Sequence, residues 1–192
     1  MVKVVKLRAP VYNHPPGGRM TKLAWVIALT GVLFATLFAQ EKNPVGAALR
    51  EALQVRSKNM VAAAEEMPAD KYSFKATPEQ MTFGHLTLHI AEANYVFCSK
   101  IGNVTAPELP KLSDTDPKEK LVERLKSSFN FCSTALAKLD DSNLGETRAL
   151  FGERKASRAA AILALAGSWA DHYSLQATYL RLNGHLPPTA KK

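Results

Sequence analysis

Three histidines in two apolar helical patterns are the residues best placed to do chemistry in this chain. His85 and His89 lie four residues apart in the segment MTFGHLTLHIAEANY, and His172 lies in the segment WADHYSLQ. Side chains four residues apart on a helix lie on one face, one turn apart, and two imidazoles placed in this way can share one metal ion. The pattern therefore predicts a site for a divalent metal at His85 and His89, with His172 as a separate candidate ligand on the last helix.

Each of these residues also has a structural interpretation. A single His that faces a core is more often held in place by hydrogen bonds than by a metal, and His pairs at this spacing also occur on solvent-facing helices. His185 lies beyond the last predicted helix and is expected in a loop. Ser168 and His172 have the spacing of a serine nucleophile and its base, but Asp171 would point about 100° away around the helix.

The elements that would hold these side chains are marked by capping residues and prolines. Asn43, Thr77 and Asp116 each stand directly before Pro, which is typical of a helix N-terminus. Apolar residues at helical spacing follow each of them, and a fourth such pattern follows Ser157. The predicted helices cover residues 44–66, 78–101, 117–139 and 157–183. Gly184 would then adopt the left-handed C-terminal conformation, and LGETRALFGERK could form a short strand or a loop.

Four helices joined by loops predict an all-α fold, an up-down four-helix bundle over residues 40–192. The second and third helices, joined by one connecting loop, are expected to be antiparallel neighbours. Cys98 would lie near the end of one and Cys132 two-thirds along the other. A disulfide and a pair of free buried thiols both fit this placement.

Residues 1–39 are interpreted as an upstream extension and a signal peptide. The run from Leu23 to Ala39 is uncharged and apolar and follows Arg19 and Lys22, which predicts export to the periplasm or the outside. Its length is at the lower edge of the roughly 17–25 residues that cross a bilayer, so an anchor formed by residues 23–39 is the alternative. Translation could start at Met1 or at Met20.

Charge excludes one class of partner. Residues 1–39 carry five of the Lys and Arg residues and no acid, so they hold most of the formal net charge of +8. In the remaining chain the basic residues are mixed with acids and form no stripe with interleaved aromatics. We therefore expect no nucleic-acid binding, and contact with a membrane only if the apolar run is retained.

Two segments resemble the DinB-like family. MTFGHLTLHIAEANYVFCSKIG is similar to the second helix of these proteins, and WADHYSLQATYLRLNGHLPPTA is similar to their last helix and tail, so that the resemblance covers residues 44–190. It implies a four-helix bundle, often a homodimer, in which three His ligands hold a divalent metal such as zinc or nickel. Relatives include thiol-dependent transferases and isomerases and metal-dependent hydrolases.

The resemblance assigns only part of a metal site. It implies that His89 and His172 are ligands, while Ser168 stands where the family has its third ligand. His85, one turn from His89, is the expected substitute ligand. Glu92 and Ser168 are expected to orient the ligands, with Glu92 as a further carboxylate donor.

Two classes of function remain open at this stage. The first is an exported metal-binding protein, a metal-dependent hydrolase or transferase that acts on a small molecule. Export makes cytosolic thiol cofactors less suitable and so favours hydrolysis over thiol transfer. The second is a non-catalytic binding or structural bundle with a degenerate metal site, which the Ser at position 168 favours.

Overall fold

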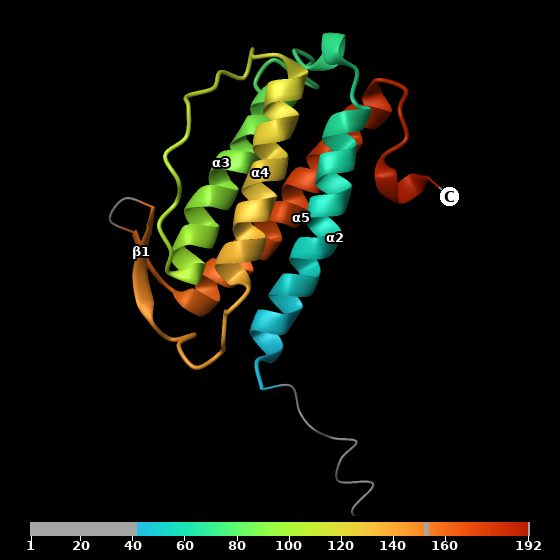
Figure 1. Ribbon diagram of the computed structural model, residues 1–192. Coiled ribbons are helices and arrows are strands. Elements are labelled where there is room, and N and C mark those ends of the chain that lie inside the picture. The colour runs from blue at the N-terminus through green and yellow to red at the C-terminus, as the bar shows by residue number, and fades with distance from the viewer. Residues whose placement is uncertain (1–41, 152–153, 192) are drawn as a thin grey trace, which may run out of the picture. The chain divides into compact units, whose positions relative to one another are not determined.

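The computed structural model describes residues 42–151 and 154–191 of the 192. In this part of the chain four long helices pack side by side, and a short hairpin lies beside the carboxyl end of α3 and the start of α5 (Figure 1). The long helices are α2 (Pro44–Glu66), α3 (Phe83–Gly102), α4 (Lys118–Leu136) and α5 (Arg158–Leu182). The hairpin consists of β1 (Thr147–Phe151) and β2 (Arg154–Ser157), and two short 3-10 helices are η1 (Ala69–Lys71) and η2 (Pro188–Ala190).

The residues Lys42–Lys192 form one compact unit. The predicted signal segment lies outside the described residues. None of the helices in the described part is both long and apolar enough to cross a membrane.

Two of the predicted helix starts are confirmed. Asn43 is the capping residue of α2 and Pro44 its first residue. Ser157 precedes α5, and its hydroxyl oxygen accepts a hydrogen bond from the backbone N–H of Ala160 at 3.2 Å. The predicted left-handed conformation beyond α5 is also confirmed, because Gly184 has a φ of 80°.

The predicted start of the second helix at residue 78 is wrong, since α3 begins at Phe83. Thr82 is the cap, and its hydroxyl accepts from the N–H of His85 at 3.0 Å. The N–H groups of Phe83 and Gly84 instead bond to the carbonyls of Phe74 and Tyr72. These bonds hold the preceding segment against the η1 region, so residues 78–82 form turns and not a first helical turn.

The limits of the third helix also differ from the prediction. Asp116 is not its cap, because its carboxylate accepts from the N–H of Ser113 at 2.8 Å and Pro117 takes the capping position. α4 ends at Leu136 and not at Leu139. The chain must turn there, because the following residues reach the start of α2.

That contact caps α2 from a distant part of the chain. The carboxylate of Asp141 accepts hydrogen bonds from the N–H groups of Val45 and Gly46 at 2.8 and 2.9 Å. In return, the side-chain oxygen of Asn43 accepts from the N–H of Asp141 at 3.1 Å. A Cβ at Gly46 would lie 2.8 Å from the carbonyl oxygen of Leu139, so only glycine permits this close approach.

The expected antiparallel packing of the second and third helices is wrong. Asn94 of α3 bonds to Ser128 of α4, and four residues later in both helices Cys98 forms a disulfide with Cys132. Because both partners advance by four residues, α3 and α4 run in the same direction, and the bundle does not alternate strictly up and down. The connecting segment 103–117 therefore returns along the whole length of α3 (Figure 1). A helix of 20 residues is about 30 Å long, which an extended segment of this length can span.

The core lies between the four helices. Its largest fully buried side chains come from all of them and include Met60, Phe83, Leu125 and Trp169. The segment left open as strand or loop is the β-hairpin, with Thr147 paired to Ser157.

Candidate functional site

His89 of α3 and His172 of α5 meet between their two helices. Their ring centroids are 5.0 Å apart and the ring planes are inclined by 69°. Both residues are half-buried. Two imidazoles on one tetrahedral zinc have ring centres about 5 Å apart, because each metal–nitrogen bond is about 2.0–2.1 Å. The pair therefore has a separation that fits one shared metal ion.

Ser168 orients the second of these rings. Its hydroxyl oxygen lies 3.0 Å from Nδ1 of His172, one helical turn away. The backbone of Ser168 also acts on this imidazole as an acceptor. We therefore assign the ring hydrogen to Nδ1, which leaves a lone pair on Nε2. This is the arrangement that metal-binding histidines usually have, with one nitrogen on the metal and the other held by the protein.

The protonation state of His172 suits the same role. Burial lowers the pKa of His172 below its usual value, and the neighbouring His89 imidazole lowers it further. The backbone of Ser168 and the carboxylate of Asp171 act in the opposite direction. At neutral pH the imidazole is therefore uncharged, which is the form that binds a metal or accepts a proton.

His85 takes a different partner from the one expected. It is exposed, and its Nδ1 lies 3.3 Å from a carboxylate oxygen of Asp114, in the segment that connects α3 and α4. The contact between His85 and Asp114 could not be predicted from the sequence, because the path of that segment depends on the parallel packing of α3 and α4. Glu92 is also exposed. His85, His89 and Glu92 line one surface cavity of about 500 Å³, closed on its other side by Lys111–Asp114.

The donors near the histidine pair do not complete a three-ligand site. No group of three or more His, Cys, Asp and Glu residues in the described ranges is arranged to hold a metal ion. What the described residues offer to a metal is two imidazoles, since the hydroxyl of Ser168 is already in contact with Nδ1 of His172. This set fits a metal whose remaining positions are taken by water or by a bound molecule.

A second polar cluster, which the sequence did not reveal, joins α3 and α5, the helices of the histidine pair, to α4. Asn94 donates to the hydroxyl of Ser128 at 3.0 Å and accepts from the indole N–H of Trp169 at 2.7 Å. The hydroxyl of Ser128 in turn donates to the carbonyl of Leu125. Asn94, Ser128 and Trp169 are almost completely buried, and we refer to them as the buried cluster. Asn94 is a polar residue within an otherwise apolar helical pattern, and this is the signal in the sequence that could have identified it.

Comparison with known proteins gives one family and one fold. The family model described as DinB superfamily matches residues 52–175. A crystal structure of a DinB-like protein from Bacillus subtilis is similar at 21% identity with a TM-score of 0.60, over 76% of this chain and 99% of that one. A DinB-like protein from Bacillus cereus is similar at 16% identity with a TM-score of 0.60, over 73% of this chain and 93% of that one. Among curated proteins, none matches the sequence.

Proposed function

This chain belongs to the DinB superfamily, and we propose that it is an exported protein that binds a divalent metal ion, zinc or nickel, through His89 and His172. The observation that supports this most directly is the separation of 5.0 Å between the two ring centroids. The contact between Ser168 and His172 adds to it, because it directs Nε2 away from the backbone of its own helix.

Two observations support export. The apolar run at residues 23–39 has the layout of a signal peptide, or of a membrane anchor if it is retained. The buried disulfide between Cys98 and Cys132 is of a kind that forms and persists in oxidising compartments. Fractionation of cells and sizing of the mature protein would separate a cleaved signal from an anchor.

The proposed catalytic chemistry depends on the metal having few protein ligands and therefore open coordination positions. A metal with open positions can polarise a carbonyl group or lower the pKa of a bound water. The protein would bind that metal with His89 and His172, orient one ring with Ser168, and admit a small molecule through the cavity at His89. We propose hydrolysis of a small molecule as the activity, with transfer to a thiol less suited to an exported protein.

A non-catalytic binding or structural bundle is the second candidate. The same ring geometry is also that of an ordinary edge-to-face contact between two aromatic rings, which needs no metal. Ser168 in place of a third His would then mark a site that has lost its metal.

Metal content decides between the two. Residues 40–192 would be purified and equilibrated with zinc or nickel, and compared with His89→Ala, His172→Ala and His85→Ala variants by metal analysis and calorimetry. We expect one metal per chain in the parent and in the His85 variant, and loss of binding in the other two. A parent without bound metal, or three variants that bind like the parent, would leave only the non-catalytic bundle. Light scattering on the same sample tests the homodimer that we propose from the family resemblance.

A further inference from the structure

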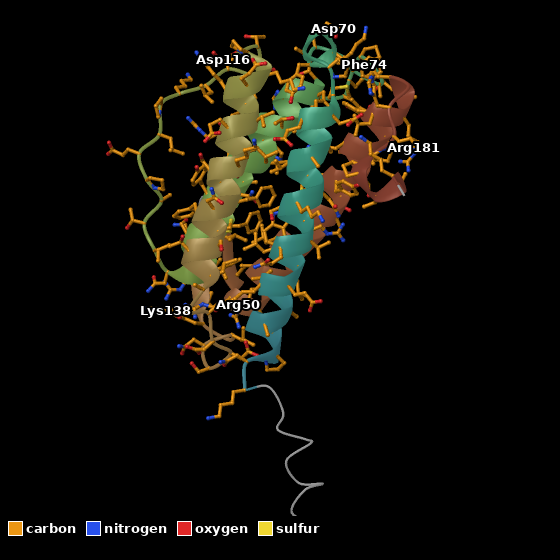
Figure 2. The ribbon with its side chains drawn as sticks, turned by 45° about the vertical axis from the view of Figure 1, so that its right-hand side comes forward. Arg50, Asp70, Phe74, Asp116, Lys138 and Arg181 are labelled. Carbon is orange, nitrogen blue, oxygen red and sulfur yellow. A yellow bond between two sulfur atoms is a disulfide. The ribbon has the colours of Figure 1, made fainter. Side chains whose placement is uncertain are left out.

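One end of the bundle exposes lysines that have no partner among the described residues. At this end lie the start of α2, the carboxyl ends of α3 and α4, and the hairpin (Figure 1). Figure 2 shows Lys138 and Arg50 there, with Asp70 and Asp116 at the opposite end. Four lysines of this end are exposed and make no hydrogen bond or ion pair within the described part of the chain. These residues, which we call the lysine surface, are Lys42, Lys100, Lys138 and Lys155.

At the opposite end the lysines are mostly paired with acids. There Lys71, Lys120, Lys126 and Lys191 each have a carboxylate partner. The partners are Asp70, Asp116, Glu65 and Glu66 respectively. The two ends therefore differ in how their lysines are compensated.

Most carboxylates at this end of the bundle contact other groups and not the four lysines. Asp141 binds the N–H groups at the start of α2, and Asp140 binds Ser142. Glu146 lies 2.6 Å from Arg148 and 3.5 Å from Arg158. Among the described residues of this end, Glu51 is the remaining acid with an exposed side chain. Asp140 and Asp141 keep their charge, because their hydrogen-bond partners are neutral, but no carboxylate of the described residues lies within ion-pair distance of these four lysines.

Two exposed apolar residues accompany the lysines. Val45, in the first turn of α2, is 37% exposed, and Val104, just after α3, is 41% exposed. A surface that carries both lysines and exposed apolar side chains suits the boundary between water and lipid headgroups.

We propose that the lysine surface binds a bilayer that contains anionic phospholipid. Each lysine near such a surface contributes about 1 kcal/mol, so four together are sufficient for reversible binding. The anchor alternative of the proposed export supports a bilayer as the partner, because a retained apolar run ends at Ala39 and α2 begins only five residues later, at Pro44. The inference uses the export proposed above but does not depend on the metal site.

Vesicle binding tests this proposal. Residues 40–192, which contain the compact unit, would be sedimented with vesicles of phosphatidylcholine alone and with vesicles that contain phosphatidylglycerol. We expect binding only to the anionic vesicles, and weaker binding as the salt concentration rises. Replacing all four lysines of the lysine surface by Gln should lower the partition coefficient by roughly 10²–10³-fold.

The matched control changes the net charge equally at the opposite end. It replaces Lys71, Lys75, Lys120 and Lys191 by Gln, and it should bind almost as the parent does. Circular dichroism would verify that both variants are folded. Equal binding to both kinds of vesicle would overturn the proposal, because the charge of the lipid would then have no role. Equal loss of binding in both variants would also overturn it, because the lysine surface would then be no more important than the opposite end.

Discussion

The buried cluster and the histidine pair are two polar groups that share α3 and α5, with the buried cluster reaching α4 as well, and they differ in whether their hydrogen bonds are complete. Asn94, Ser128 and Trp169 exchange donors and acceptors with one another and are almost inaccessible to solvent. His89 and His172 are half-buried, and His172 keeps one ring nitrogen that no described protein atom uses. Trp169 directly follows Ser168, so neighbouring residues of α5 belong to the two different groups.

This difference teaches how to separate structural from functional polar residues inside a bundle. A satisfied buried network stabilises one packing arrangement, and removing one partner leaves another without a bond. A half-buried pair with a free lone pair gives little stability but can bind a ligand. The predictions below test this division, beginning with the largest expected effect.

Removal of the disulfide should give the largest loss of stability. Cys98 lies one turn beyond Asn94 and ties α3 to α4 on the side of the buried cluster. With a sequence separation of 34 residues, the bond should contribute about 4 kcal/mol by restricting the unfolded chain. Urea unfolding of the Cys98→Ala, Cys132→Ala double variant would measure this. A loss below about 1 kcal/mol would mean that helix packing alone fixes this side of the bundle.

Asn94→Ala should be the most damaging single change in the buried cluster, at about 3 kcal/mol. It leaves the indole N–H of Trp169 buried without an acceptor and also opens a small cavity. His89→Ala, only five residues away on α3, should cost less than about 1 kcal/mol in the absence of metal. Similar losses of unfolding free energy in the two variants would contradict the proposed difference between the buried cluster and the histidine pair.

Ser168→Ala should weaken metal binding by about 10–100-fold, or roughly 1.4–2.8 kcal/mol, because the ring of His172 loses its orienting contact. Ser168→His, which supplies a third imidazole, should bind metal more tightly than the parent. Calorimetric titration with zinc measures both variants, and unchanged stability in urea would serve as the control. A Ser168→Ala variant that binds like the parent would show that the hydroxyl does not position the ring.

The pH dependence of stability should give the smallest effect. Burial lowers the pKa of His172 in the folded protein, so the unfolded chain binds more protons between the two pKa values. The contribution of His172 to stability is thus complete above its unfolded pKa of about 6.5 and is lost as the pH falls through the folded value. Urea midpoints of the metal-free protein at pH 7.5 and 5.5 should differ by less in His172→Gln than in the parent. An unchanged pH dependence in the variant would assign the effect to other groups.

The sequence was sufficient where local chemistry decides the structure. Ser157 and Gly184 mark their helix ends through a bond and a backbone angle within a few residues, and Pro44 marks the start of α2 after Asn43. These positions were predicted correctly, although the side chain of Asn43 bonds to the distant Asp141. Thr77 carries the same kind of signal, but the helix begins after Thr82. The carbonyls of Phe74 and Tyr72 accept hydrogen bonds from the N–H groups of Phe83 and Gly84, which holds the preceding segment outside the helix. The residue pattern of one segment does not show which of two possible capping residues the tertiary contacts will favour.

The packing of helices could not be obtained from the sequence in the same way. The direction of α4 relative to α3 depends on how the segment 103–117 crosses the bundle, and its length allows both directions. The same segment decides the partner of His85, since it carries Asp114. That His89 and His172 face each other also depends on helix packing, and only the family resemblance indicated it.

The cap of α2 has a consequence for how the chain acquires its structure during synthesis. Asp141 follows the N–H groups that it binds by 95 and 96 residues. A ribosome makes the chain from its amino end, so α2 emerges long before the carboxylate that completes its first turn exists. The start of α2 therefore stays frayed until most of the protein has been made, and its closure reports that the bundle has assembled.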